Sequence, residues 1–148
     1  MFKIRVKEDI CSGCLSCVAA CSLSHEGYAS PSGARLRINL ELSERNRISF
    51  CHQCRNAPCA KACPAGAITQ DSEESPWLIN PDICDSGEVC PPMDACPFHA
   101  ILRDPLTRKI IKCDLCNGGR PACVDACPTG ALSIVGEESE VIEASKLE

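Results

Sequence analysis

Apolar and polar residues alternate in several short stretches along this 148-residue chain. Residues 2–6 alternate apolar and basic side chains and predict a short strand that leads into a cysteine-rich loop. Residues 34–40 and 47–50 alternate with the same period of two, so they predict a hairpin across the polar segment 41–46.

Five further short strand patterns follow. Residues 67–69 and 77–80 flank an acidic turn and predict a second hairpin. Residues 100–103 and 109–112 flank an Asp-Pro turn and predict a third, and residues 131–135 predict a last strand.

The composition provides few of the bulky side chains that usually fill a core. The chain has three Phe, one Trp and one Tyr, but fifteen Cys. A secreted disulfide scaffold is one explanation of so many cysteines. The odd count, the clustering of the cysteines in runs and the lack of an apolar signal after the first residues favour metal sites instead.

The first cysteine run has the spacing C-x2-C-x2-C-x3-C, which is typical of bacterial ferredoxins that bind iron–sulfur clusters. Cys11, Cys14 and Cys17 are close enough along one loop to bind three corners of a single cubane. Cys21 lies one helical turn beyond Cys17, about 6 Å further along the axis. It therefore points toward a second cluster, and the run needs a partner run elsewhere.

The chain supplies three partner runs, which together contain the remaining cysteines: Cys51, Cys54, Cys59 and Cys63; Cys84, Cys90 and Cys96; Cys113, Cys116, Cys123 and Cys127. Three of the runs end in a repeated Cys-Pro-x-x-Ala unit, in which a cysteine ends a helical turn and proline breaks it. We predict an α+β fold of two ferredoxin-like dicluster modules, with short helices and hairpins packed around iron–sulfur clusters. Module one is residues 1–50 plus 104–135, module two is residues 51–103, and residues 136–148 form an acidic tail.

Residues 2–135 resemble the four-cluster ferredoxin-like electron-transfer subunits of molybdenum and tungsten oxidoreductases, such as dimethyl sulfoxide reductase. Within that family, the chain resembles in particular the small subunits of tungsten aldehyde oxidoreductase and tungsten benzoyl-CoA reductase complexes. The segments that carry the resemblance are Cys21-Ser-Leu-Ser-His-Glu-Gly with Ala34-Arg-Leu-Arg-Ile, Cys51-His-Gln-Cys54 with Ala57-Pro-Cys59, and Lys112-Cys-Asp-Leu-Cys116.

The resemblance implies that the runs exchange their fourth ligands. It assigns one [4Fe-4S] cluster to Cys11, Cys14, Cys17 and Cys127, and a second to Cys113, Cys116, Cys123 and Cys21. A third cluster takes Cys51, Cys54, Cys59 and Cys96. Cys63, Cys84 and Cys90 remain for a degenerate fourth site that has no fourth thiol.

The defect in the third run is local. Gly87 occupies the place of the middle cysteine, and five residues separate Cys90 from Cys96. The fourth site is therefore empty, holds a [3Fe-4S] cluster, or holds a cubane with a ligand such as Asp85 or water. The stiff Pro91-Pro92 pair argues against an intact cubane pocket. Zinc remains an alternative for these thiols, above all at this site.

We expect a non-catalytic electron-transfer subunit, since no phosphate loop, nucleophile elbow or pterin motif is present. The resemblance implies a tungsten or molybdenum catalytic subunit of the aldehyde oxidoreductase or aryl-CoA (benzoyl-CoA) reductase type, with further electron-transfer subunits or ferredoxin as other partners. The alternatives are a subunit of a hydrogenase, carbon monoxide dehydrogenase or formate system, and a free polyferredoxin.

The net charge and the lack of long apolar runs argue against two kinds of partner, nucleic acid and the membrane interior. A net charge of −5 argues against a nucleic-acid binder. No stretch approaches about 18 consecutive apolar residues, so we expect no direct membrane insertion and a cytoplasmic location.

A few charged residues near the cysteines invite a functional interpretation. His25 is expected to be a surface or capping residue, with contact to a partner or to a cluster sulfur as the alternative. Arg35, Arg37, Lys109 and Lys112 either raise cluster potentials by offsetting negative charge or form a solvated strand face.

Overall fold

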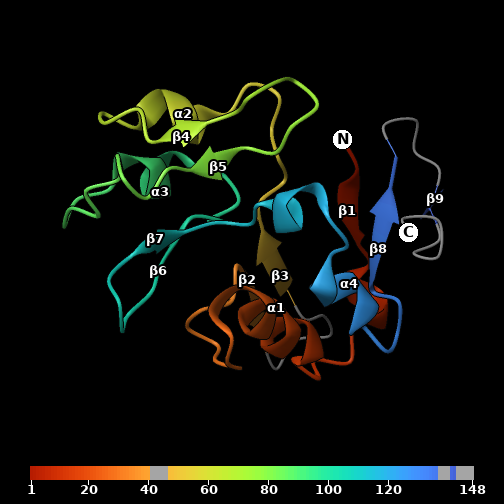
Figure 1. Ribbon diagram of the computed structural model, residues 1–148. Helices are drawn as coiled ribbons and strands as arrows, with labels where there is room; N and C mark the ends of the chain where they lie inside the picture. The colour runs from red at the N-terminus through yellow and green to blue at the C-terminus, as the bar shows by residue number, and fades with distance from the viewer. Residues whose placement is uncertain (41–46, 137–140, 143–148) are drawn as a thin grey trace.

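The computed structural model describes residues 1–40, 47–136 and 141–142 (Figure 1). The predicted turn at 41–46 and most of the predicted acidic tail lie outside the described residues. In chain order the elements are β1 (Lys3–Val6), η1 (Glu8–Ile10), α1 (Ser16–Glu26), β2 (Leu36–Asn39), β3 (Arg47–Phe50), α2 (Pro58–Ala62), β4 (Ile68–Thr69), β5 (Leu78–Ile79), α3 (Pro91–Ala95), β6 (Leu102–Arg103), β7 (Ile110–Ile111), η2 (Leu115–Gly118), α4 (Ala122–Asp125), β8 (Leu132–Val135) and β9 (Val141–Ile142).

The strand predictions are confirmed. The three hairpins form as β2–β3, β4–β5 and β6–β7, each a separate antiparallel pair. The first and last predicted strands pair with each other: β1 runs antiparallel to β8, with Lys3 opposite Val135 and Val6 opposite Leu132. Strands from the beginning and from near the end of the described chain therefore lie side by side in one sheet.

The described residues form two packed cores. The first lies between α1, α4, the β2–β3 hairpin and the β1–β8 pair, in the lower and right-hand part of Figure 1. Its buried members include three thiols among ordinary apolar side chains: Cys17, Val18, Cys21, Ala34, Leu36, Ile48, Phe50, Cys123 and Leu132. Cysteine side chains thus occupy positions that large apolar residues hold in other small domains.

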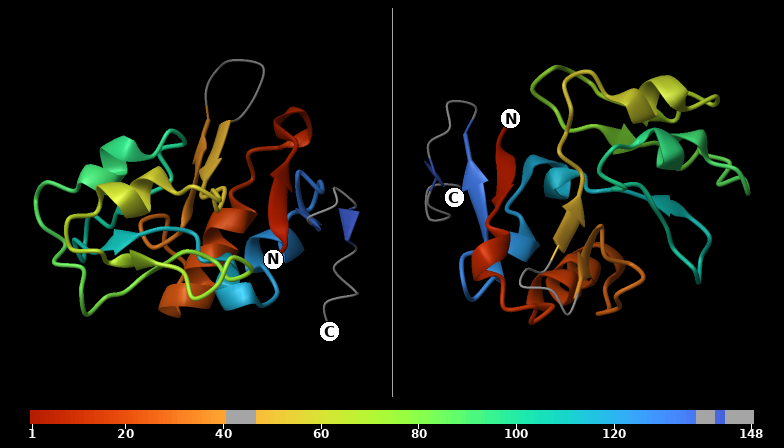
Figure 2. Two further views of the ribbon diagram at one scale, coloured as in Figure 1. Left: turned by 90° about the horizontal axis from the view of Figure 1, so that it is seen from above. Right: turned by 180° about the vertical axis from the view of Figure 1, so that it is seen from behind.

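The second core lies under α2, α3 and the β4–β5 and β6–β7 hairpins, which extend away from the first core in all three views (Figure 2). Its buried members are Ala57, Cys59, Ile68, Cys96, Ala100, Ile101 and Ile110. The β6–β7 hairpin spans the predicted boundary at residue 104, and both Ile101 and Ile110 pack in this second core.

The Cys-Pro-x-x-Ala repeat folds as one turn in all three copies. The third residue after each cysteine has a positive φ: +64° at Gly66, +48° at His99 and +70° at Gly130. Its N–H group donates to the carbonyl of the cysteine over 3.1, 3.1 and 3.5 Å respectively. Glycine adopts this left-handed conformation without strain, whereas His99 adopts it at some cost.

The Pro91-Pro92 pair lies in the first turn of a helix. Helix α3 begins at Pro91, much as α2 begins at Pro58, with proline in the first turn of each helix. Proline is tolerated there because the first N–H groups of a helix have no partner inside it. The pair therefore does not disrupt the backbone of the third run.

No helix in the part of the chain that the structure describes is both long and apolar enough to cross a membrane.

The β1–β8 closure is testable through Ile134, which is 1% exposed and lies opposite Ile4. We expect Ile134→Ala to destabilise the loaded protein by about 2–5 kcal/mol, because it removes buried apolar atoms and leaves a cavity. The measurement is the urea midpoint under anaerobic conditions. Leu106→Ala is the control, since Leu106 is 73% exposed; equal shifts for both variants would contradict the prediction.

Candidate iron–sulfur centres

The first thiol site lies where the loop before α1 meets the end of α4. Cys11, Cys14, Cys17 and Cys127 line one cavity, which Ile38, Ile48 and Leu132 close on the apolar side. Cys14 is exposed, whereas Cys17 is buried. Burial raises the pKa of Cys17 to about 11, and the charges of Cys127, Cys11 and Cys14 act in the same direction. Thiolates at this density require a cationic centre among them.

The second thiol site lies on the other side of Leu132, which lines both cavities. Cys21 from α1 faces Cys113, Cys116 and Cys123 across a largely apolar cavity, lined also by Ile4, Leu36, Phe50, Leu115 and Pro121. Burial raises the pKa of Cys113 to about 12 and raises that of Cys123 still more strongly. The neighbouring thiols Cys113, Cys21 and Cys116 add to the rise at Cys123.

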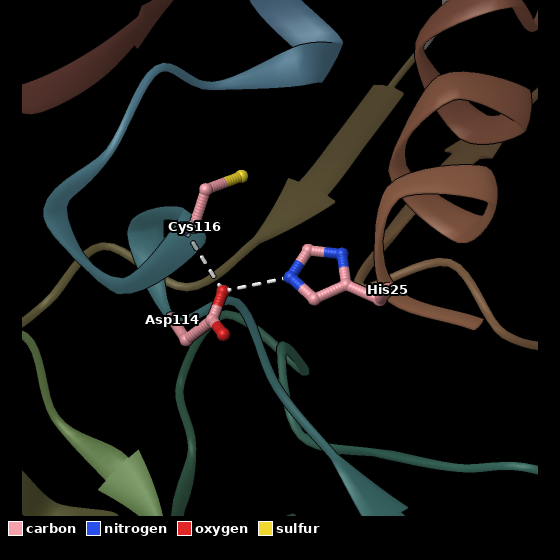
Figure 3. A group of neighbouring side chains, drawn as sticks. All are labelled: His25, Asp114 and Cys116. Carbon is pink, nitrogen blue, oxygen red and sulfur yellow. Dashed lines mark hydrogen bonds and ion pairs between the residues drawn. The ribbon is translucent and has the colours of Figure 1, made fainter. Parts of the chain in front are cut away.

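An ion cluster supports the second site (Figure 3). His25 Nε2 lies 3.0 Å from Asp114 Oδ1, and the Arg35 guanidinium donates to Asp114 Oδ2 over 2.6 Å. The N–H group of Cys116 donates to Asp114 Oδ1 over 3.0 Å. Burial raises the pKa of Asp114, but the hydrogen bond from His25 and the charge of Arg35 outweigh it and lower this pKa to about 2.

His25 is not the surface residue expected from the sequence, because its side chain is only 11% exposed. Its Nδ1 lies 2.8 Å from the carbonyl oxygen of Cys21 and 3.8 Å from the Cys21 sulfur. The hydrogen bonds to Asp114 and Cys21 raise the pKa of His25 to about 10 despite burial. The contact with the Cys21 carbonyl is not a helix cap, because Cys21 lies inside α1 and not in its last turn; the Cys21 sulfur is the cluster-ligand contact that the sequence offered as an alternative.

Ligating atoms of His25, Asp114 and Cys116 lie within 4.8 Å of one another. The Asp114 oxygens already accept three hydrogen bonds, from His25, Arg35 and the Cys116 amide. We therefore interpret this group as support for the second thiol site and not as a separate metal site.

Arg35 indicates that the second cavity fits an acceptor-rich group. Arg35 lines the cavity, and its backbone N–H group donates to the Cys21 sulfur over 3.3 Å. Its buried Nε has no hydrogen-bond partner among the described residues. The sulfides of an iron–sulfur cluster would supply such an acceptor, and four thiols are the donor set that cubanes use.

The third thiol site is formed by α2, the loop before it and the end of α3. Burial raises the pKa of Cys54 and of Cys59, and Cys51 and Cys96 add to the rise at both. Cys59 and Cys96 are buried in the second core. The Ala100 amide of the repeat donates to the Cys96 sulfur over 3.4 Å.

The fourth site has three thiols. Burial raises the pKa of Cys90, and the charges of Cys84 and Cys63 act in the same direction, so the three residues lie together. Pro92 stands four residues before Cys96, at the place that Cys59 holds before Cys63. A fourth protein thiol is therefore absent from this site.

The loop of the third run keeps the backbone of the complete runs. The third residue of each loop has a positive φ: +70° at Gly13, +50° at Gln53, +50° at Ser86 and +53° at Leu115. Arg103 donates to the carbonyl oxygens of Ser86, Gly87 and Glu88. Asp85, the alternative ligand expected from the sequence, uses Oδ1 to accept the Gly87 N–H over 3.1 Å.

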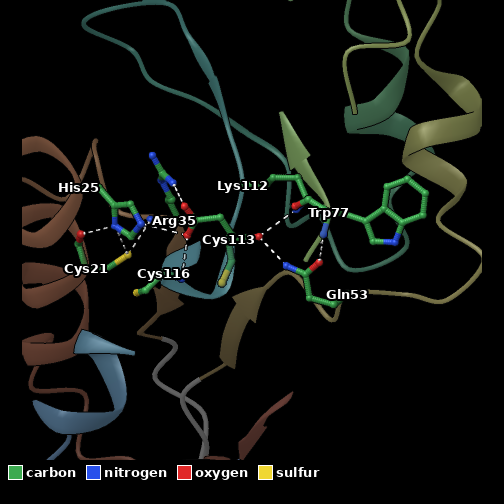
Figure 4. A network of polar contacts seen from close by, with 9 residues as sticks. Cys21, His25, Arg35, Gln53, Trp77, Lys112, Cys113 and Cys116 are labelled. Atoms are coloured by element: carbon green, nitrogen blue, oxygen red, sulfur yellow. Dashed lines mark hydrogen bonds and ion pairs between the residues drawn. The ribbon is translucent and has the colours of Figure 1, made fainter. Parts of the chain in front are cut away.

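A buried polar network joins the second and third sites (Figure 4). Gln53 donates through Nε2 to the Cys113 carbonyl and accepts the Trp77 N–H, both over 2.8 Å. The Trp77 indole donates to the Cys54 carbonyl over 3.1 Å. Lys112 is 3% exposed, so it does not belong to a solvated strand face as the sequence allowed, whereas Lys109 is exposed.

The four sites form a series. Leu132 separates the first from the second, the charge of Cys51 acts on Cys113 between the second and third, and α2 joins the third to the fourth through Cys59 and Cys63. Sequence analysis could not identify Gln53 or Trp77 as linking residues, because nothing local distinguishes them from packing residues.

Comparison with known proteins agrees with this chemistry. Residues 47–137, more than half of the chain, match the family described as 4Fe-4S dicluster domain. Protein NrfC of Escherichia coli (strain K12) is 33% identical over 156 residues, covering 95% of this chain and 67% of that protein. The aliphatic sulfonate oxidoreductase polyferredoxin-like subunit of Pyrococcus furiosus is 36% identical over 125 residues, covering 84% and 70%. Formate hydrogenlyase subunit 2 of E. coli K12 is 34% identical over 173 residues, covering 93% and 82%.

Among solved structures, the active-site complex BamBC of benzoyl-coenzyme A reductase contains a chain with the same fold. Its TM-score is 0.55 at 23% sequence identity, and the match covers 99% of this chain and 84% of that one. The chain therefore belongs to the 4Fe-4S dicluster ferredoxin-type family and is an iron–sulfur electron-transfer subunit.

Proposed function

We propose that this chain relays single electrons to or from a separate catalytic subunit, a tungsten or molybdenum pterin oxidoreductase of the aldehyde oxidoreductase or aryl-CoA (benzoyl-CoA) reductase type. The observation that carries the relay is the series of three complete four-thiol sites. The similarity to a sulfonate oxidoreductase polyferredoxin-like subunit and to a chain of benzoyl-CoA reductase supports the type of partner.

The complete sites are Cys11, Cys14, Cys17 and Cys127; Cys21, Cys113, Cys116 and Cys123; and Cys51, Cys54, Cys59 and Cys96. Each would hold one [4Fe-4S] cluster, which supplies one-electron chemistry when bound. The chain itself supplies thiolates, apolar cavity walls at the first two sites and amide donors. The amides of Arg35 and Ala100 donate to cysteine sulfurs over 3.3 and 3.4 Å, which stabilises negative charge there.

Amides act in the same way at the end of the first site. Burial raises the pKa of Cys127, but the backbone N–H groups of Leu132, Thr129 and Ala131, with the Thr129 hydroxyl, outweigh it and lower this pKa. Cys127 is thereby prepared to bind as a thiolate. The Cys-Pro-x-x-Ala repeat therefore forms a turn and, at Cys127, also supplies amides that favour the thiolate form.

The exposed residues at the first site suit contact with a partner. Cys14 is exposed, and beside it in sequence Ile10 is 42% and Leu15 37% exposed. We assign this edge to the catalytic subunit. At the other end of the series, Ile83 is 46% and Val89 81% exposed beside Cys84 and Cys90, which suits a further electron-transfer subunit or ferredoxin.

We infer that the fourth site carries no cubane, since Cys63, Cys84 and Cys90 supply only three thiols and Asp85 is engaged in its own loop. The two dicluster modules, residues 1–50 plus 104–135 and residues 51–103, are part of the same proposal, although the β6–β7 hairpin crosses their boundary and Ile110 packs in the second core. The cytoplasmic location stays a prediction.

A second candidate partner follows from one similarity. Formate hydrogenlyase subunit 2 matches over 93% of this chain, which supports a hydrogenase, carbon monoxide dehydrogenase or formate system as the alternative. A free polyferredoxin would use the same sites without a bound partner.

Metal content tests the number of clusters. The anaerobically purified, reconstituted chain should be brown and contain about twelve iron atoms, because three cubanes hold four each. About three more would indicate a [3Fe-4S] cluster at the fourth site. A full sixteen would contradict the absence of a fourth cubane, and a colourless zinc protein would overturn the iron–sulfur assignment.

Single substitutions test which thiols matter. Cys14→Ala should lower the iron content by about one to four atoms, depending on whether the first cluster becomes [3Fe-4S] or is lost. Cys14 is exposed, so the change disturbs little packing. Cys63→Ala, the matched variant at the fourth site, should leave about twelve. Equal iron loss in both variants would contradict the assignment of ligands.

Affinity purification from the native host tests the partner. The chain should be recovered with a larger subunit, and metal analysis of the complex should find tungsten or molybdenum. Nickel would favour a hydrogenase or carbon monoxide dehydrogenase instead. Recovery of the loaded chain alone, at native expression levels, would favour a free carrier.

A further inference from the structure

A buried ammonium group lies between the second and third thiol sites (Figure 4). Lys112 Nζ donates to the carbonyl oxygen of Cys113 over 2.9 Å and to that of Trp77. No carboxylate of the described residues forms an ion pair with it. Burying a charge that only neutral carbonyls contact is costly, so the surroundings of Lys112 require an anion.

The same network prevents Lys112 from moving independently of the two sites. Gln53, 2% exposed, connects the Cys113 carbonyl to the Trp77 amide, and the Trp77 indole donates to the Cys54 carbonyl. Cys113 belongs to the second site and Cys54 to the third. The ammonium group is therefore held directly by the backbone of Cys113 and by the backbone of Trp77, whose side chain in turn contacts the backbone of Cys54.

Lys112 lies against both sites. Its ammonium group contacts the backbone of Cys113 at the second site, and its other contact, Trp77, donates through its indole to the backbone of Cys54 at the third site. A positive charge held at this position attracts negative charge at both sites. The cavity of the first site, by contrast, is lined by residues of other segments.

We infer that Lys112 is a charge-compensating positioning residue shared by the second and third sites, and that it raises the reduction potentials of both relative to the first. The inference rests on the proposed function, because it requires clusters at those two sites. A four-thiolate cubane is anionic and gains one more negative charge on reduction, so a fixed cation beside it favours the reduced form.

The test is an anaerobic redox titration of the full chain with reconstituted clusters, followed by electron paramagnetic resonance. In Lys112→Met, two of three midpoint potentials should fall, each by roughly a tenfold loss in the equilibrium constant for reduction, which is about 59 mV for a one-electron couple. The third midpoint, from the first site, should stay in place.

Three further variants separate charge from structure. Lys112→Arg keeps the charge, so its midpoint potentials should stay near those of the wild type. Lys112→Gln keeps a hydrogen-bond donor without the charge, so its potentials should fall as in Lys112→Met. Lys109→Met removes the same charge from an exposed position nearby, where solvent screens it, and should shift little.

The outcomes distinguish this inference from the proposed function. Missing iron in the wild type would refute the proposed relay itself. Full iron content with a wild-type potential in Lys112→Gln would overturn the inference, as would equal shifts in Lys109→Met and Lys112→Met or an equal fall at all three sites. If Lys112→Met fails to assemble, the comparison of Lys112→Gln with Lys112→Arg decides alone.

Discussion

Each complete thiol site is closed by a cysteine from a distant part of the chain, and the fold depends on this constraint. Cys127 joins the loop of residues 11–17, Cys21 joins the segment 113–123, and Cys96 joins the segment 51–59. Bringing such distant residues together costs chain entropy, and burying unpaired thiols does little to recover it. A metal centre bound at each junction would stabilise both cores at once, so cluster binding and folding are coupled.

The buried charges follow the same geometry. His25, Arg35 and Asp114 gather at the second site, Lys112 lies between the second and third, and Arg103 clamps the loop of the fourth. In a domain filled with hydrocarbon side chains, these groups would be expensive to bury. Beside anionic centres the cations are favourable, and Asp114 keeps its charge because three donors surround it.

The sequence predicted most of the local structure and little of what connects it. The hairpins and the terminal strands followed from alternation, and the Cys-Pro-x-x-Ala turn followed from its repetition. The position of His25 did not, because its partner Asp114 lies 89 residues away and no local pattern connects them. The burial of Lys112 was equally hidden, since a basic residue at a strand end is usually solvated. The ligand sets that the resemblance implies stay a prediction; the members of the first two sets each line one cavity, and Cys51 and Cys96 of the third act on the pKa of Cys54 and Cys59.

The third run shows how such a scaffold can lose a ligand without losing its shape. Ser86 keeps the left-handed conformation found at the same place in the three complete loops, although Gly87 has replaced the cysteine that follows it. The Arg103 guanidinium satisfies carbonyl oxygens of this loop, and the Asp85 carboxylate satisfies the Gly87 amide. These hydrogen bonds hold the loop from within, so its backbone does not depend on a fourth metal–sulfur bond. In the proposed relay, the chain would therefore retain its outer hairpins and the exposed surface beside Cys84 and Cys90 while electron transfer ends one centre earlier.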